Sequence, residues 1–215
     1  MKPKRAGSEP GLREARQLAR QGLATEQLLN VAEALFSDRG LDKTTLRAIA
    51  EAAEMSIGGV YQSFAGKQEL YRAVFARRAD LYHTGLADAM ANSPTALGQL
   101  ASFVSYTTTF YKEHPRWGRL ILRHAGPTLF AGADFIDPEQ TLGFEGSSAV
   151  LATIIQHGQE TGEFRPGDSQ TFMRLVSAVM LAHMSTDPAI VDEVATTTPL
   201  SADDLTDLLA RLLRP

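Results

Sequence analysis

Cysteine is absent from the 215-residue chain, which excludes disulfide bonds, thiol catalysis and zinc sites built on cysteine. Long apolar runs are missing too, because no stretch approaches the roughly 20 residues that cross a bilayer. The basic N-terminus is not followed by an apolar segment, so it does not resemble a secretory signal. These absences predict a cytoplasmic protein without a membrane partner.

Charge is unevenly distributed along the chain, although the net charge is only -4. Residues 1–80 hold 13 Lys and Arg against 10 Asp and Glu, whereas residues 81–215 hold 8 against 15. A basic front and an acidic back are expected when only one end of a protein faces phosphates. Hydrophobic residues make up 44% of the chain, which is enough to bury a core.

The apolar residues recur at helical spacing, and no strand-like alternation or fixed repeat is present, so we predict an all-α fold. Residues 1–24 carry few large apolar side chains and are expected to form a flexible basic arm, helical at most toward its end. The helix starting near Lys67 is expected to turn Leu70, Val74, Leu81 and Leu86 inward. Gly/Pro/Asp-rich residues predict a loop over 127–137, and 186–200 are polar. The expected helices are 25–40, 44–53, 57–64, one from about 67, 94–113, 115–126, 138–161, 168–186 and 201–213.

Capping residues mark several of these expected helix ends. Gly40 suits the end of the first helix, and Thr44 or Thr45 can cap the next. Asp168 can cap the helix that follows Gly167. Ser201 with Asp204 resembles a capping box before the last helix.

Residues 44–64 carry the strongest functional signal, because two short helices are joined by the tight connection Glu54-Met55-Ser56. The second helix contains Gly58 and Gly59, and each glycine costs roughly 1 kcal/mol against alanine in a helix. A helix with such low intrinsic propensity must be held by its neighbours, which usually means that its position serves a function. Small residues let the backbone of such a helix approach a partner closely. An ordinary helical hairpin remains open on this pattern alone.

Residues 26–75 resemble the N-terminal DNA-binding domain of the TetR (tetracycline-repressor) family. The matching stretches are LLNVAEALFSDRG, TTLRAIAEAAEMSIGGVYQSF and GKQELYRAVF. The resemblance implies a helix-turn-helix DNA-binding domain over 25–72 and a helical ligand-binding and dimerisation domain over 73–215. In the second domain only GQETGEFRPGD is similar to the family.

The resemblance also implies which side chains bind DNA. The second helix of the motif would lie in the major groove, with Tyr61 and Lys67 on phosphates, Arg47 on a base edge or a phosphate, and Gln62 toward bases. Glu54 departs from the Gly or Asn often found in the turn, Ile57 from a polar residue, and Ala65-Gly66 from a Ser or Asp cap. The candidate DNA-binding residues are Thr45, Arg47, Ser56, Ile57, Gly58, Gly59, Tyr61, Gln62 and Lys67.

Aromatic and methionine side chains gather in residues 94–185, where they form either core or the lining of an apolar pocket. The last two helices resemble by their order those with which the family dimerises. The five His have no recognised metal spacing, and no catalytic triad or nucleotide fingerprint is present, which predicts no enzyme and no cofactor. The candidate pocket residues are Phe103, Tyr106, Phe110, Trp117, His124, Phe144, His157 and Met180.

Together these features predict a homodimeric repressor that binds double-stranded DNA at a palindromic operator and is released by a small-molecule effector. One alternative is an all-α small-molecule-binding protein or enzyme that does not bind DNA. Another keeps the DNA binding but makes the protein an activator or an architectural factor.

Overall fold

The computed structural model describes residues 11–130, 144–191 and 198–215, and the side chains of 124–130 and 144–145 lie outside that description. Every regular element in these residues is a helix, which confirms the all-α prediction. None of the helices described is both long and apolar enough to span a bilayer. In chain order they are α1 (Leu12–Lys43), α2 (Leu46–Ala52), α3 (Ile57–Ser63), α4 (Lys67–Met90), α5 (Ala96–Glu113), α6 (Pro115–Phe130), α7 (Phe144–Glu160), α8 (Ser169–Thr186), α9 (Pro188–Val191) and α10 (Ala202–Leu213).

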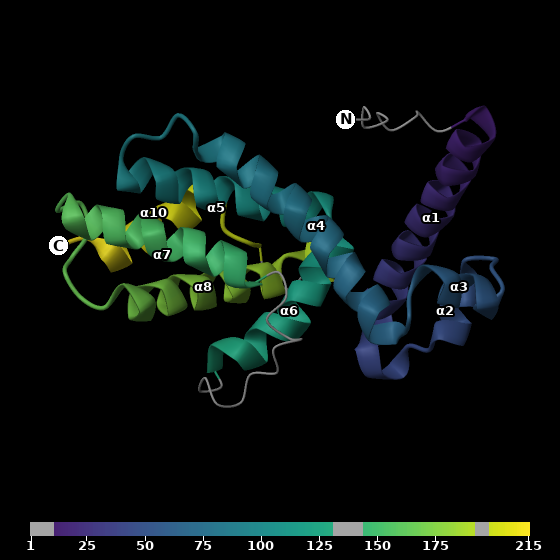
Figure 1. The fold of residues 1–215 in the computed structure, drawn as a ribbon. Coiled ribbons are helices and arrows are strands. Elements are labelled where there is room, and N and C mark those ends of the chain that lie inside the picture. Colours follow the sequence, from purple (N-terminus) through teal and green to yellow (C-terminus); the bar gives the residue numbers. More distant parts are fainter. Residues whose placement is uncertain (1–10, 131–143, 192–197) are drawn as a thin grey trace, which may run out of the picture.

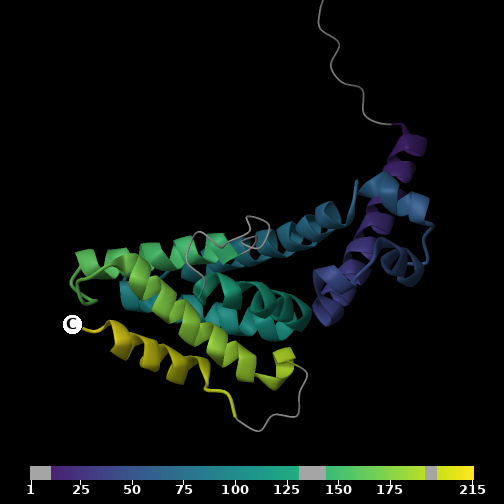
Figure 2. The same cartoon turned by 90° about the horizontal axis from the view of Figure 1, so that it is seen from below.

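Helices α1, α2 and α3 form an N-terminal unit, and α4 leads from this unit into the larger helical body (Figure 1). Within the body, α5 packs against α4, α7 and α10, while α6 packs against α8 and against α1 of the N-terminal unit. Figure 2 shows α7, α8 and α10 extending away from the N-terminal unit. The two units therefore meet where α1 contacts α4 and α6.

The core of the N-terminal unit follows the predicted apolar spacing. Leu28, Ala32 and Phe36 from α1 are fully buried, as are Ile49 from α2 and Val60 from α3. These positions recur every three or four residues on one helix face, so burial against neighbouring helices stabilises each short segment. The poor intrinsic propensity of α3 is thereby offset by packing.

Helix ends fall where the capping pattern predicts them. Gly40 has a φ of 80°, a left-handed conformation that ends the regular part of α1. The side chains of Thr45, Asp168 and Ser201 each accept a hydrogen bond from the backbone N–H three residues later. Of the two candidates for the second helix, Thr45 is the cap.

Along α4 one expected core residue is wrong. Leu81 is 49% exposed, whereas Leu70, Val74 and Leu86 are buried as expected. Tyr82 takes the inward position and is 2% exposed. Since Tyr82 lies eight residues after Val74 and four before Leu86, it continues the buried stripe, and Leu81 lies about 100° away from it.

Three further differences concern helix limits. Helix α1 begins at Leu12, although residues 1–24 were expected to be a flexible arm that is helical at most toward its end. Helix α6 continues to Phe130 although Gly126 and Pro127 were expected to end it, and residues 131–143 lie outside the described part of the chain. The short helix α9 was not expected within the polar segment 186–200. Asp187 starts it by accepting a hydrogen bond from Ala189 N at 3.0 Å, and Pro188 suits its first position. A single turn carries too little periodicity to be recognised in sequence.

Aromatic side chains connect the N-terminal unit to the body. The ring centroids of Phe36 and Tyr71 lie 4.9 Å apart, those of Tyr71 and Phe75 lie 4.8 Å apart, and Phe75 lies 4.7 Å from Trp117. This row runs from α1 through α4 to α6 in edge-to-face and tilted contacts, which aromatic rings favour. It makes the junction between the two units a packed core.

Candidate nucleic-acid interface and ligand cavity

Side-chain caps fix the starts of α2 and α3. The hydroxyl of Thr45 accepts a hydrogen bond from Ala48 N at 3.1 Å, and the hydroxyl of Ser56 accepts one from Gly59 N at 3.1 Å. Each cap satisfies a backbone N–H that the helix itself leaves unpaired. The two short helices of the predicted motif therefore begin at defined residues.

The turn between α2 and α3 is tight although it lacks glycine. Glu54 has a φ of 56°, a left-handed conformation that costs a residue with a Cβ roughly 1–2 kcal/mol. Met55 N donates to Ala50 O at 2.9 Å, and the side-chain amide of Gln27 in α1 donates to Ala53 O at 3.0 Å. The departure at Glu54 thus leaves the helix-turn-helix geometry intact.

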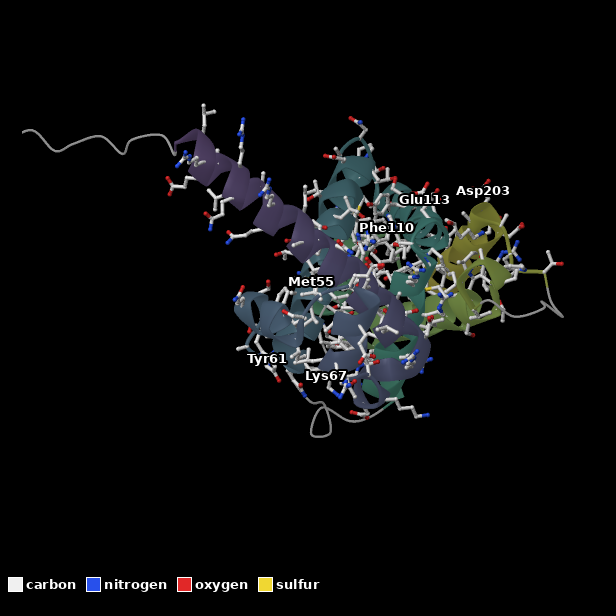
Figure 3. All side chains as sticks on the ribbon, turned by 90° about the vertical axis from the view of Figure 1, so that its right-hand side faces the viewer. Met55, Tyr61, Lys67, Phe110, Glu113 and Asp203 are labelled. Carbon is white, nitrogen blue, oxygen red and sulfur yellow. The ribbon has the colours of Figure 1, made fainter. Side chains whose placement is uncertain are left out.

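Helix α3 has a buried face and an exposed face. Val60 is fully buried and Phe64, at the helix end, is 8% exposed. Tyr61 and Ile57 are 57% and 43% exposed, and Gln62 is exposed as well. Figure 3 shows Tyr61 at the outer edge of the N-terminal unit. The fold therefore anchors α3 from one side and leaves the other side open.

The internal packing of the protein does not require glycine at position 58. A Cβ added to Gly58 would meet only the Ser56 hydroxyl, at 3.9 Å. At Gly59 a Cβ would lie 3.4 Å from that hydroxyl and 3.6 Å from Met55 Cε, which is ordinary contact. Because glycine destabilises an exposed helix, its presence here points to close approach by something outside the chain.

Two cations flank the motif in different settings. The Arg47 side chain is 85% exposed and its Nε lies 3.0 Å from Glu51 Oε1. Lys67, half-buried at the start of α4, donates from Nζ to Leu41 O at 2.8 Å. This bond uses one of the three ammonium protons, so Lys67 is oriented and keeps two donors. Glu69 reinforces the start of α4 by accepting from Ala65 N, which compensates for the missing Ser or Asp cap.

A small cavity of about 30 Å³ lies in the body, between α4, α5, α6, α7 and α8. This volume is room for about one water molecule. No charged side chain of the described residues lines it. The lining is Tyr82, Phe103, Thr107, Tyr111, Ile121, Ser147, Ser148, Ser177, Met180, Leu181 and Met184.

Hydroxyl groups supply the polar character of this cavity. The Tyr82 and Thr107 hydroxyls lie 2.8 Å apart and share a hydrogen bond. Burial raises the pKa of Tyr82 and of Tyr111, so both phenols stay neutral at physiological pH. The hydroxyl of Ser148 is buried without a hydrogen-bond partner in the described part of the protein. The cavity is therefore chemically suited to an uncharged, largely apolar group that can hydrogen-bond a hydroxyl.

Four of the eight predicted pocket residues line either the cavity or a groove on the outside of the body. Phe103 and Met180 line the cavity. Tyr106 and Phe110 instead line a groove on the outside of α4 and α5, together with Glu113, which lies near Phe110 in Figure 3.

Of the remaining four, Trp117 belongs to the aromatic row at the junction and is not among the residues that line the cavity. His157 Nδ1 lies 3.3 Å from Gln99 Oε1, away from the cavity lining. The side chains of His124 and Phe144 lie outside the described residues. Whether any of the eight contacts a ligand stays a prediction.

Sequence reasoning based on aromatic side chains missed the hydroxyl residues of the cavity. Thr107 and Tyr111 stand four residues apart on α5, and Ser177 precedes Met180 and Met184 on α8. Both sets lie on buried helix faces. The available signal was a hydroxyl side chain within an otherwise apolar stripe, such as Thr107 on α5 and Ser177 on α8.

Arginines of α6 bind the N-terminal unit directly. Arg119 donates from Nε to the Ser37 hydroxyl at 3.0 Å and from Nη1 to Ile190 O at 2.8 Å. Arg123 donates to the backbone oxygens of Ser37 at 3.1 Å and of Asp38 at 3.3 Å. Ile121, between these arginines in sequence, lines the cavity. One helix therefore contacts both the cavity and the end of α1.

A buried carboxylate joins α1 to α4. Glu33 is 3% exposed, and its carboxylate lies 2.6 Å from Arg77 Nη2 and 3.0 Å from Arg78 Nε. Arg77 also contacts Glu26 at 2.9 Å. Two guanidinium groups on one buried carboxylate fix the angle at which α4 leaves the N-terminal unit.

Comparison with known proteins places this arrangement in a family. Residues 28–74 match the model of the bacterial regulatory proteins of the tetR family. The chain is 24% identical over 141 residues to the HTH-type transcriptional repressor KstR2 of Mycolicibacterium smegmatis, across 66% of this chain and 67% of that protein. It is 32% identical over 98 residues to the HTH-type transcriptional activator FasR of the same organism, across 46% and 45%.

A solved structure shares the fold over most of the chain. The transcriptional regulator FadR from Bacillus subtilis, in complex with stearoyl-CoA, aligns with a TM-score of 0.69 over 86% of this chain and 97% of that one, at 16% identity. The tetR-family match covers most of the N-terminal unit and the first part of α4, where the helix-turn-helix residues lie. The N-terminal unit of the chain is therefore similar to that of the bacterial regulatory proteins of the tetR family, and the curated relatives it matches are HTH-type transcriptional regulators.

Proposed function

We propose that this protein is a homodimeric repressor that binds a palindromic operator in double-stranded DNA and is released from it by a small molecule. The observation that carries the proposal is the exposed face of α3, with Ile57, Gly58 and Tyr61 outward and Val60 anchoring the helix. A regulator of this family acts on the chromosome of a bacterium, so we place it in the cytoplasm.

Base recognition is assigned to three side chains of the motif. Arg47 can donate two hydrogen bonds to the O6 and N7 of a guanine, and Gln62 can pair with adenine in the same bidentate way. Ile57 offers an apolar contact to a thymine methyl group. All three are exposed, as such contacts need.

Phosphate contacts are assigned to groups around these. The hydroxyls of Thr45 and Tyr61 and the free donors of Lys67 can bind phosphate oxygens, and the N-terminus of α4 adds a favourable dipole beside Lys67. Ser56, Gly58 and Gly59 form the first turn of α3, where small side chains would let the backbone lie close to the DNA.

Exposed leucines on the last helices support a dimer. Leu175 on α8 is 46% exposed and Leu208 on α10 is 48% exposed. Burying both against a second copy would remove apolar surface from water. A two-fold dimer places its recognition helices in successive major grooves when they are about 34 Å apart, which is why the operator should be palindromic.

The cavity supports an uncharged or mainly apolar ligand moiety. Neutral phenols, serines and a threonine line it, and the Ser148 hydroxyl is free to bind a polar group. The stearoyl-CoA present in the related FadR structure carries an apolar acyl chain of this character.

Ligand binding would have to enlarge the cavity. Drug-sized ligands need about 300 Å³ or more, against about 30 Å³ here. Displacing Ile121 would move α6, whose Arg119 and Arg123 bind the end of α1. Displacing Tyr82 would move α4, which begins beside the motif at Lys67. Either movement would change the position of α3, provided that ligand binds the two states with different affinity.

DNA binding is tested with the full chain. A duplex is selected from a random library and its affinity is measured by fluorescence anisotropy over a salt series. The double variant Tyr61→Phe with Lys67→Ala should bind more weakly to every duplex and show a shallower salt slope. Tyr106→Phe, which removes a phenol far from the motif, is the matched control. If the unmodified protein binds no duplex from the library, the proposal fails. The alternative, a small-molecule-binding protein or enzyme that does not bind DNA, then replaces it.

Induction is tested separately. A panel comprising a fatty alcohol, a sterol and stearoyl-CoA is screened by thermal shift, and any compound that stabilises the protein is added to the preformed complex. Release of the duplex is expected. A compound that stabilises the protein while operator affinity stays constant would contradict induction.

Activation is the second candidate, because one relative is an activator. A reporter gene placed behind the selected duplex distinguishes the two roles. Repression predicts higher reporter expression when this protein is deleted, whereas activation predicts lower expression.

A further inference from the structure

The start of α1 stands apart from the rest of the protein. Residues 11–23 are all exposed, and in Figures 1 and 2 this end of the helix projects beyond α2 and α3. The backbone of α1 stays helical from Leu12 until Gly40. The direction of the projecting segment is therefore set by the packed part of the same helix.

Three arginines line one side of this projecting segment. With 3.6 residues per turn, positions 13, 16 and 20 lie within about 40° of position 27 around the helix axis. Gln27 faces the motif, because its side-chain amide donates to Ala53 O in the turn between α2 and α3. Arg13, Arg16 and Arg20 thus lie on the side of α1 that faces the helix-turn-helix.

Nothing in the described structure neutralises this basic stripe. Arg13, Arg16 and Arg20 are exposed and form no ion pair with any described residue. Glu14 is the one acidic residue among positions 11–23. The segment is therefore positively charged in a chain whose net charge is -4. An unpartnered cationic stripe beside a DNA-reading motif matches a polyanion.

We infer that residues 12–23 of α1 form a second DNA-contact surface, which binds the phosphates flanking the bases read by α3. The inference rests on the proposed function and adds a contact outside the helix-turn-helix. Arg13 lies about 21 Å along the helix axis from Gln27, a length of about six base pairs. The three arginines contribute affinity that is independent of DNA sequence and sensitive to salt.

The test compares the full-length protein with the triple variant Arg13→Ala, Arg16→Ala, Arg20→Ala on the selected duplex and on a random duplex. Because these side chains are exposed and alanine favours helix, thermal stability should not change. Affinity should fall at least tenfold for both duplexes, and the salt slope should decrease by about 2 to 3 per protomer. A triple lysine variant keeps the charge and should retain the affinity.

Footprinting supplies an independent readout. Hydroxyl-radical protection by the unmodified protein should extend a few base pairs further at each end than protection by the alanine variant. If the alanine variant keeps the affinity, salt slope and footprint of the unmodified protein while the Tyr61→Phe, Lys67→Ala variant loses binding, the inference is overturned and the proposed function stands. If the unmodified protein binds no duplex, both are lost.

Discussion

The candidate residues of the N-terminal unit face away from the protein, whereas the cavity residues of the body face inward. Tyr61 and Ile57 remain about half exposed, while Phe103 and Met180 are 4% and 5% exposed. The first pair needs the fold only as a support. The second pair exists as a site only because several helices meet, so its shape depends on every helix around it.

Because of this difference, substitutions in the two regions should affect folding stability and binding differently. A change on the exposed face of α3 should alter DNA affinity and leave folding intact. A change in the cavity should alter folding as well as ligand binding, because its lining is also core. The junction at Glu33, where the two regions meet, should be the most sensitive to substitution.

Glu33→Gln is expected to have the largest effect. Loss of the buried charge leaves Arg77 and Arg78 without their shared counterion, which should lower the free energy of unfolding by about 3 kcal/mol. Urea unfolding measures the change. The exposed pair of Arg47 and Glu51 is the control, and Glu51→Gln should cost less than about 0.5 kcal/mol. Equal losses for the two variants would show that the junction is not a buried ion-pair site.

Gly58→Ala should separate binding from stability. The added methyl group meets open space within the protein, so the variant should be as stable as the unmodified chain or more stable by up to about 1 kcal/mol. It should lower DNA affinity about thirtyfold by obstructing the groove, as anisotropy would show. Thermal unfolding of the same variant is the control, because a loss of affinity caused by misfolding would also lower its stability. Unchanged affinity would place α3 outside the groove.

Removing either of two hydroxyl groups from the cavity should change the stability of the fold in different ways. Thr107→Val leaves the buried Tyr82 hydroxyl without its partner and should cost about 1–2 kcal/mol in thermal unfolding. Ser148→Ala removes a hydroxyl that has no partner in the described residues, so it should be neutral or stabilising. A loss at Ser148 as large as that at Thr107 would mean that the hydroxyl is already satisfied.

Glu163→Gln should destabilise the fold less than Thr107→Val does, and its effect should depend on pH. Hydrogen bonds from Leu97 N and Ala96 N, at 3.1 and 3.0 Å, hold the pKa of this carboxyl below its usual value. The carboxylate therefore stabilises the fold above the pKa of the unfolded chain, and this contribution disappears as pH falls through the lowered pKa. Because solvent screens this carboxylate, the variant should lose at most about 0.5 kcal/mol at neutral pH and nothing in acid. Denaturation curves at both pH values test this.

The segment GQETGEFRPGD shows how a sequence resemblance can gain a structural explanation. Gly162 adopts a left-handed φ of 77°, which a residue with a Cβ rarely takes. Glu163 caps the start of α5, and Phe164 packs so closely on Gly158 that a Cβ there would clash. These contacts fix how the chain turns between α7 and α8, at the stretch for which the sequence suggested a resemblance.

Much of the N-terminal unit could be predicted from sequence because its signals are local. Apolar spacing identified the buried face of α1, and capping residues marked where α2 and α3 begin. The resemblance implied an outward Tyr61, and this side chain is 57% exposed beside the buried Val60. The assignment of individual DNA contacts remains a prediction.

The sequence by itself determined that the chain is helical, where most helices begin, and which motif carries the candidate DNA-binding residues, since neighbouring residues encode all three. Only the tertiary structure decided what each buried face packs against. Arg119 donates a hydrogen bond to Ser37, which lies 82 residues away in sequence, and Arg77 donates one to Glu33, which lies 44 residues away. The cavity forms where five helices converge. The physical reason is that periodicity reports which side of a helix avoids water, whereas the partner on that side is set by the packing of the whole fold.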